Sequence, residues 1–131
     1  MTYLWVAMGG ALGSMMRYGL SGVVMDMTGG TFPYGTMFVN VTGAMLIGVF
    51  ASLSAPESRF FVPVSARLFL MTGICGGYTT FSTFSLETFN LMRDGELLPA
   101  LGNMLLSVAL CIISVWIGYS AVLLLSRSRG G

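Results

Sequence analysis

The stretch GICGGYTTFSTFSLE, Gly73 to Glu87, decides how the fold is interpreted, because it lies inside an apolar run that extends from residue 62 to residue 92. Glycines gather at its start, and hydroxyl side chains alternate with two phenylalanines after them. Glycine weakens a helix, and a hydroxyl group needs a hydrogen-bond partner when it leaves water. A helix that only crosses hydrocarbon needs neither feature, so the segment indicates a special role.

The composition around this stretch is that of an integral membrane protein. Of the 131 residues 55% are hydrophobic and 8% are charged, whereas a soluble domain carries roughly 25% charged residues. A hydrocarbon core of about 30 Å takes about 20 helical residues to cross. Runs of that length cover residues 3–25, 33–53, 62–92 and 98–125. We therefore predict an all-α membrane protein with four transmembrane helices in a single domain, residues 1–131.

Several other features exclude classes of function. The first run carries Arg17 and lacks the basic start and cleavage site of a signal peptide, so we expect it to remain as a helix. A net charge of +1 offers no basic patch for nucleic acid. Cys75 and Cys111 lie in apolar runs of a chain without histidine, which favours reduced packing residues over metal ligands.

A second copy of the chain is expected, because four helices make a thin bundle with little interior for polar groups. Small residues four positions apart agree with close helix packing: Gly9 with Gly13, and Gly73 with Gly77. We therefore predict a homodimer.

The arginines give a modest signal for orientation. If the N-terminus is cytoplasmic, one arginine, Arg93, falls on the outer side. The cytoplasmic side then receives Arg59, Arg67, Arg127 and Arg129. This excess follows the positive-inside rule.

Three polar residues in the first two runs are candidates for function. Arg17 either faces an anion pathway or vestibule, or reaches the membrane surface as a structural residue. Thr36 and Asn40 are four residues apart and share one helical face. The amide of Asn40 needs a dedicated partner, which is either an ion pathway or a hydrogen bond between helices.

The third run is longer than one span requires, and Gly73, Gly76 and Gly77 lie near its middle. This pattern predicts a discontinuous helix, broken near residues 73–80, whose free backbone groups line a cavity. The alternative is a continuous helix in which the glycines permit close packing.

Past the glycines, helical spacing places Phe81, Phe84, Ser85 and Thr88 on one face, while Ser82 and Thr83 point elsewhere, where they could line a neighbouring path. Two such rings usually belong to a packed core. Because an aromatic ring has a positive edge, ring edges and hydroxyl donors could instead hold a small anion. The fourth run adds a weakly polar stripe of Asn103, Ser107 and Cys111.

Three motifs together resemble the Fluc family of bacterial fluoride channels, also called CrcB proteins. The motifs are GGALGSMMRYGL, PYGTMFVNVTGAMLIG and GGYTTFSTFSLE, and the likeness covers essentially the whole chain. The resemblance implies an antiparallel homodimer, inserted in both orientations in the bacterial inner membrane and surrounded by its lipid. It also implies two narrow pores built from both subunits and a structural sodium ion at the dimer centre.

The resemblance assigns roles to residues of this sequence. Asn40, Phe81 and Phe84 would line the fluoride path, with polar contacts from Thr36, Ser82, Thr83 and Ser107. Arg17 would lie in a vestibule at the pore mouth, and the main-chain carbonyls of Gly76 and Thr79 would bind the sodium ion. We therefore predict passive, fluoride-selective conduction out of the cell.

Other functions fit this sequence less well than a channel does. A small four-helix multidrug transporter needs a membrane-embedded carboxylate in its first helix, where this chain has Arg17. An enzyme would need a base or a metal site, yet histidine is absent and the carboxylates are expected at or near helix ends or in loops. These carboxylates are Asp26, Glu57, Glu87, Asp94 and Glu96. An accessory membrane subunit stays possible.

Overall fold

The computed structural model describes residues 1–56, 58 and 60–128, and every regular element in that part of the chain is a helix. The all-α prediction is therefore confirmed. Glu57, Arg59 and Arg129 lie outside the described residues. The elements are α1 (Thr2–Thr28), α2 (Tyr34–Leu53), α3 (Val64–Arg67), the π-helix η1 (Leu68–Cys75), α4 (Gly76–Tyr78), α5 (Phe81–Arg93) and α6 (Leu97–Ser128).

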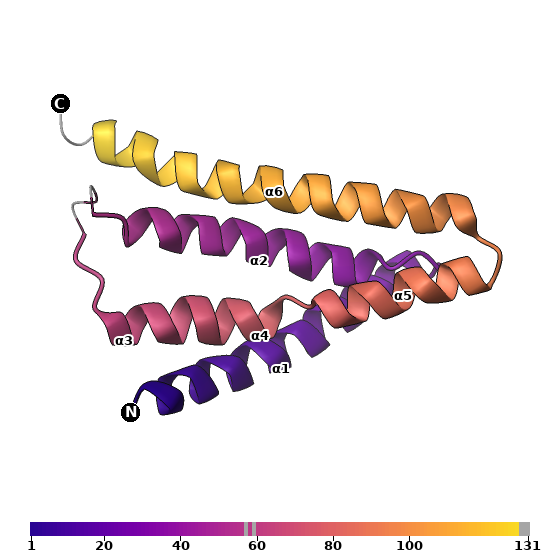
Figure 1. The fold of residues 1–131 in the computed structure, drawn as a ribbon, viewed down its shortest axis with the longest axis horizontal. Helices are drawn as coiled ribbons and strands as arrows, with labels where there is room; N and C mark the ends of the chain where they lie inside the picture. The colour runs from indigo at the N-terminus through magenta and orange to yellow at the C-terminus, as the bar shows by residue number, and fades with distance from the viewer. Residues whose placement is uncertain (57, 59, 129–131) are drawn as a thin grey trace.

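The long segments run alternately in opposite directions, and the start of α1 and the end of α6 lie at the same end of the bundle as α3 (Figure 1). Helix α2 packs along α6, while α1 crosses the other side of the bundle and packs against η1 and α4. Helix α1 ends at Thr28 and is capped by Gly29, whose φ of 62° is left-handed, a conformation that glycine adopts without strain. The third segment, which comprises α3, η1, α4 and α5, thus packs against α1 and also contacts α2 and α6.

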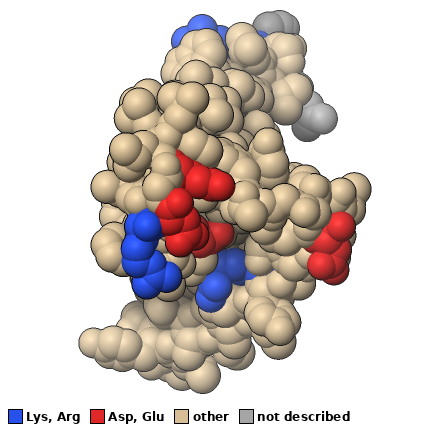
Figure 2. All heavy atoms as spheres, turned by 90° about the vertical axis from the view of Figure 1, so that its right-hand side faces the viewer, with Lys and Arg blue, Asp and Glu red and all other residues tan. Residues whose placement is uncertain are grey.

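Two helices are long and apolar enough to cross a membrane by length and composition: α2, with a mean hydropathy of 1.7, and α6, with 2.4. Much of the outer surface is apolar, and on α6 the exposed side chains include Ile112, Trp116 and Leu124. Figure 2 shows one face on which the charged side chains gather in a few places and the remaining surface carries none. Such a surface suits a lipid environment.

Glycines bring α1 into backbone contact with the third segment. A Cβ atom added to Gly9 would lie 2.9 Å from the Cα of Gly73, and one added to Gly73 would lie 2.8 Å from the Cα of Gly9. From their spacing alone, these glycine pairs were expected to support contact between two copies of the chain. The structure instead uses them inside one chain, where only a residue without a side chain fits.

The third segment is interrupted at Thr79 and Thr80, which lie between α4 and α5. Gly73 belongs to η1, and Gly76 and Gly77 belong to α4, so these glycines are helical. The interruption falls within the predicted range, residues 73–80, but the glycine cluster does not form it, and that part of the expectation was wrong. The glycines serve the close packing that was considered as the alternative, and two β-branched residues, which favour extended backbone, form the interruption.

Candidate functional site

The interruption is held by hydrogen bonds from its own threonines. Thr79 (φ −85°, ψ 156°) and Thr80 (φ −149°, ψ 115°) are extended. The hydroxyl of Thr79 donates to the carbonyl of Cys75 at 2.9 Å, and the hydroxyl of Thr80 accepts from the N–H of Thr83 at 3.1 Å. Thr80 is therefore the N-cap of α5.

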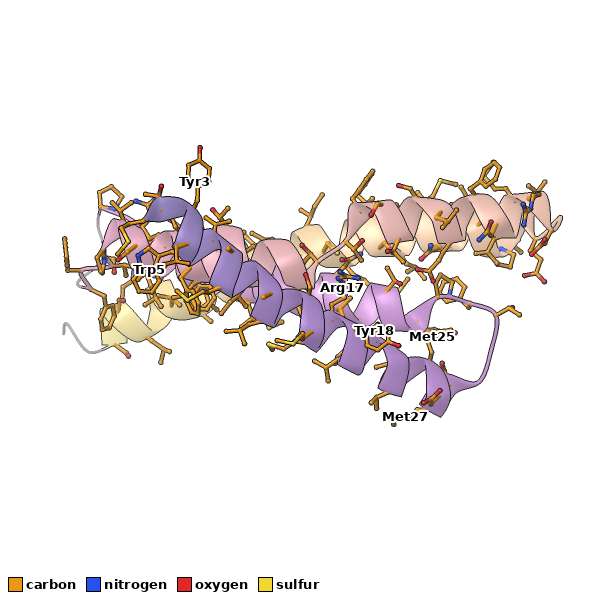
Figure 3. The ribbon with its side chains drawn as sticks, turned by 90° about the horizontal axis from the view of Figure 1, so that it is seen from below. Tyr3, Trp5, Arg17, Tyr18, Met25 and Met27 are labelled. Atoms are coloured by element: carbon orange, nitrogen blue, oxygen red, sulfur yellow. The ribbon has the colours of Figure 1, made fainter. Side chains whose placement is uncertain are left out.

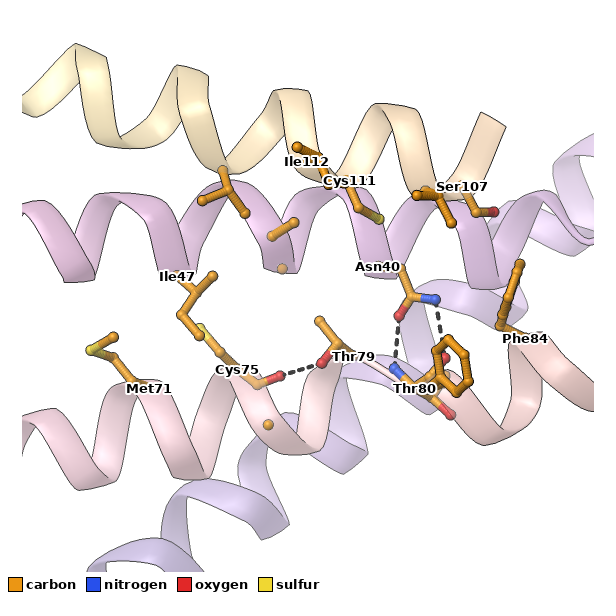
Figure 4. A pocket seen from close by; sticks show the side chains of 16 residues that line it. Asn40, Ile47, Met71, Cys75, Thr79, Thr80, Phe84, Ser107, Cys111 and Ile112 are labelled. Atoms are coloured by element: carbon orange, nitrogen blue, oxygen red, sulfur yellow. Dashed lines mark hydrogen bonds between the residues drawn. The ribbon is translucent and has the colours of Figure 1, made fainter. Parts of the chain in front are cut away.

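Asn40 reaches from α2 to the same point. Its Oδ1 accepts from the N–H of Thr80 at 2.7 Å, and its Nδ2 donates to the carbonyl of Thr80 at 3.1 Å (Figure 4). The amide has two N–H groups, so this pairing leaves one of them for another acceptor. Asn40 thus links α2 to the third segment by hydrogen bonds, which was one of its two predicted roles, and one N–H of its amide is left over.

Arg17 reaches the interruption from α1. Its Nε donates to the carbonyl of Gly77 at 3.0 Å, and the side chain is half-buried. Figure 3 shows Arg17 extending from α1 toward the third segment near the point where that segment is interrupted. The side chain is therefore bound to backbone at the end of α4.

Two carbonyl groups beside the interruption keep free lone pairs. A helical carbonyl at Gly76 would take its donor from residue 79 or beyond, but the N–H of Thr79 goes to Cys75 and that of Thr80 goes to Asn40. Among the hydrogen bonds of the described residues, none ends on the carbonyl oxygen of Gly76 or of Thr79. Backbone oxygens of this kind are ligands for a hard cation.

A cavity of about 450 Å³ opens between α2, α6 and the third segment. Most of its lining is apolar. Six of the residues predicted to line the fluoride path or to bind sodium lie together in its lining: Asn40, Gly76, Thr79, Phe81, Phe84 and Ser107. An apolar cavity with a few convergent polar groups is the usual form of a binding site.

The two phenylalanines of α5 contact each other at this cavity. Their ring centroids are 5.5 Å apart and their planes are inclined by 48°. Phe81 is 78% exposed in the single chain, whereas Phe84 is half-buried. Phe81 therefore presents its ring on the open side of the cavity, where it is not part of a packed core.

Ser107 belongs to a chain of hydrogen bonds that joins α6 to α5. Its hydroxyl donates to Asn103 Oδ1 at 3.1 Å, Asn103 Nδ2 donates to Thr88 Oγ1 at 2.9 Å, and Thr88 Oγ1 donates to the carbonyl of Phe84 at 2.7 Å. The polar stripe predicted on α6 thus has a structural role. The hydroxyl of Ser107 has already donated its proton to Asn103, so it can only accept a further hydrogen bond.

The remaining candidates lie outside the cavity lining, as does Arg17. The hydroxyl of Thr36 donates to the carboxylate of Glu87. Ser82 is exposed, with its hydroxyl 3.4 Å from that of Thr80, and Thr83 is half-buried. The structure therefore divides the predicted residues between the cavity and its surroundings.

Sequence reasoning missed two residues of this region. Glu87 was expected near a helix end or in a loop but lies within α5, where it is half-buried and binds Thr36. Thr80 was not singled out, although a threonine before a helix is a recognisable N-cap signal. Both connect the interruption and α5 to the rest of the bundle.

Comparison with known proteins finds strong similarity over almost the whole chain. Residues 4–119 match the model of the family described as "CrcB-like protein, Camphor Resistance (CrcB)". The protein of Methylocella silvestris named "Fluoride-specific ion channel FluC" is 51% identical over 99% of both chains. Two further relatives carry the same name. The protein of Rhodospirillum rubrum is 50% identical over 97% of this chain and 98% of the relative. The protein of Opitutus terrae is 52% identical over 98% of this chain and 97% of the relative.

Proposed function

This chain belongs to the CrcB-like protein family, and from that membership we propose that it is a passive, fluoride-selective ion channel that lets fluoride leave the cytoplasm. The observation that carries the proposal is the 51% identity, over 99% of both chains, with a protein named as a fluoride-specific channel. The name describes an ion channel, which is a non-enzymatic function.

The proposed path follows the cavity. Fluoride is small and strongly hydrated, so a pore has to replace its water with several close donors, which larger chloride would fit poorly. The free N–H of Asn40 is one such donor. The ring edges of Phe81 and Phe84 supply positive potential without a full charge. All three residues line the cavity.

Hydroxyl groups near the cavity would complete the path. Ser82 and Thr83 lie on the first turn of α5 and are the nearest candidates. The hydroxyl protons of Thr36 and Ser107 already bind acceptors in the chain, Glu87 and Asn103. These two groups would have to leave those acceptors before they could donate to fluoride.

The proposed assembly is an antiparallel homodimer with two pores, in which each subunit crosses the bacterial inner membrane four times. The openness of the site supports a second copy, because Phe81 is 78% exposed and the cavity lies at the surface of a single chain. A ring used for an anion has to be shielded from lipid on that side. The partner subunit would provide the shield and the second wall of each pore.

Backbone carbonyl oxygens of this chain would suit a structural sodium ion at the dimer centre. The carbonyl oxygens of Gly76 and Thr79, which no donor in the described part of the chain satisfies, would hold it. Hard cations prefer oxygen ligands. When bound, the ion supplies a positive charge that ties the two interrupted segments together, while the protein supplies neutral ligands.

The test is transport by the purified protein alone. In liposomes it should release fluoride without any other polypeptide, whereas an accessory subunit would pass no ion. A multidrug transporter would instead move a cationic dye, and dye uptake without fluoride efflux would refute the channel.

A further inference from the structure

We infer that Arg17 is a positioning residue: its Nε–H caps the carboxyl end of the half-helix that stops at Tyr78, by donating to the carbonyl of Gly77 at 3.0 Å. This role differs from a vestibule residue that attracts the anion by its charge. The inference rests on the proposed function only for its effect on ion flux.

The interruption creates the need for this cap. In an uninterrupted helix the carbonyl of Gly77 would accept from the N–H of Phe81, four residues later. Thr79 and Thr80 are extended, so that donor is lost and the carbonyl is one of the orphan groups of a helix end. Arg17, 60 positions earlier in the chain, supplies the replacement. Its positive charge also suits the carboxyl end of a helix.

The contact face of α1 leads to this position. Gly9, Gly13 and Arg17 recur every four residues and so share one face of the helix. Gly9 lies against Gly73, and a Cβ atom on Gly13 would lie 2.9 Å from the backbone nitrogen of Tyr78. The face that packs along η1 and α4 therefore ends in the side chain that caps them.

The surroundings of Arg17 agree with a role as a cap. Among the described residues its side chain makes one hydrogen bond, to Gly77. Neither residue lines the cavity that Asn40, Phe81 and Phe84 share. The guanidinium group therefore acts on the shape of the backbone that positions those residues.

Two substitutions separate the hydrogen bond from the charge. Glutamine carries its Nε2 the same number of bonds from Cα as the Nε of arginine, so Arg17→Gln keeps a donor at this position without the charge. Lysine has a methylene group there and its Nζ lies one bond further out, so Arg17→Lys keeps the charge and removes the donor from the position of Nε. Arg17→Ala removes both. Arg93, an exposed arginine in the last turn of α5, serves as the control with the same substitutions.

The experiment measures hydrogen–deuterium exchange of the peptide that contains residues 77–83, and fluoride efflux per folded protein. We expect Arg17→Gln to stay within about twofold of the parent in both, and Arg17→Lys and Arg17→Ala to change both by about tenfold or more, the scale of one lost hydrogen bond to a charged group. All three Arg93 variants should match the parent.

The opposite order overturns the inference. If Arg17→Lys stays near the parent and Arg17→Gln does not, the charge is what matters, and if both fall equally, the Nε–H alone does not carry the role. An Arg17→Lys protein that fails to fold while Arg17→Gln folds supports the cap, and the reverse refutes it. A parent protein that passes no fluoride refutes the proposed function instead. In that case the hydrogen–deuterium exchange of residues 77–83 alone tests the cap.

Discussion

The side-chain amide of Asn40 binds both backbone groups of Thr80: Oδ1 accepts from the N–H at 2.7 Å and Nδ2 donates to the carbonyl at 3.1 Å. This pairing has the form of a backbone pair, although one partner is a side chain from α2. It supplies hydrogen-bond partners for the N–H and the carbonyl of Thr80, an extended residue between the two half-helices. It also fixes where the remaining N–H of Asn40 points, and that N–H is the group we propose as a donor to fluoride.

The first prediction concerns that amide. Asn40→Asp keeps an acceptor for the N–H of Thr80, but it replaces the donor with a negative oxygen beside the carbonyl of Thr80 and in the path of an anion. We expect fluoride efflux per folded protein to fall at least about tenfold, which corresponds to 1.4 kcal/mol. Asn90→Asp adds the same charge on α5 away from the cavity and should conduct normally. Normal flux in folded Asn40→Asp would remove Asn40 from the pore.

The second prediction concerns the rings at the cavity. Phe81→Ile and Phe84→Ile keep an apolar side chain and delete the positive ring edge. We expect each to abolish or severely reduce fluoride efflux while the protein elutes as the same oligomer on size exclusion. Phe89→Ile, at a 56% exposed position of α5, is the matched control and should conduct like the parent.

Parental flux in both isoleucine variants would contradict the aromatic path. The phenylalanines would then be packing residues, and the anion would have to follow other donors.

The third prediction tests the glycine contact between α1 and η1. A Cβ atom in Gly9→Ala would lie 2.9 Å from Gly73 Cα, so the helices have to separate. We expect the free energy of unfolding in detergent to fall by about 1–3 kcal/mol. A Cβ atom in Gly10→Ala meets nothing within 4 Å, so that variant should be neutral or gain up to about 1 kcal/mol. Equal effects of the two changes would show that the contact does not require glycine.

The fourth prediction concerns removal of sodium. Exchange of sodium for N-methyl-D-glucamine at constant ionic strength should lower the thermal midpoint and the dimer fraction, because a ligand present at 100 times its Kd stabilises the folded state by about 2.7 kcal/mol. Gly76→Ala keeps the main-chain carbonyl, and its Cβ would lie 3.9 Å from the nearest atom, so this variant should keep the sodium response. Stability that does not depend on sodium in the parent would refute the site.

Much of the fold follows from local patterns in the sequence. Apolar length alone predicted helices at 33–53 and 98–125, and the structure has them at Tyr34–Leu53 and Leu97–Ser128. Spacing of four placed Thr36 and Asn40 on one face, and both do bind the segment between Thr80 and Glu87. Periodicity is enough here because each helix satisfies its own backbone.

The position of the interruption depended on contacts that the sequence does not show. Glycine is compatible both with a break and with close approach, and the presence of α1 decides for close approach at Gly73. The interruption lies at Thr79 and Thr80 instead. Asn40 binds Thr80 there and Arg17 binds Gly77 beside it, and both come from distant parts of the sequence. The role of Glu87 was missed for the same reason, since its partner Thr36 is 51 positions away.

Selective transport is the most direct test of the account. Liposomes that contain the purified protein and are loaded with potassium fluoride or potassium chloride are opened to charge-balanced efflux with valinomycin, and ion-specific electrodes follow the released anion. We predict rapid release of fluoride, and chloride release no faster than from protein-free liposomes. Equal release of the two anions, or no release of fluoride from liposomes that hold folded protein, would contradict it.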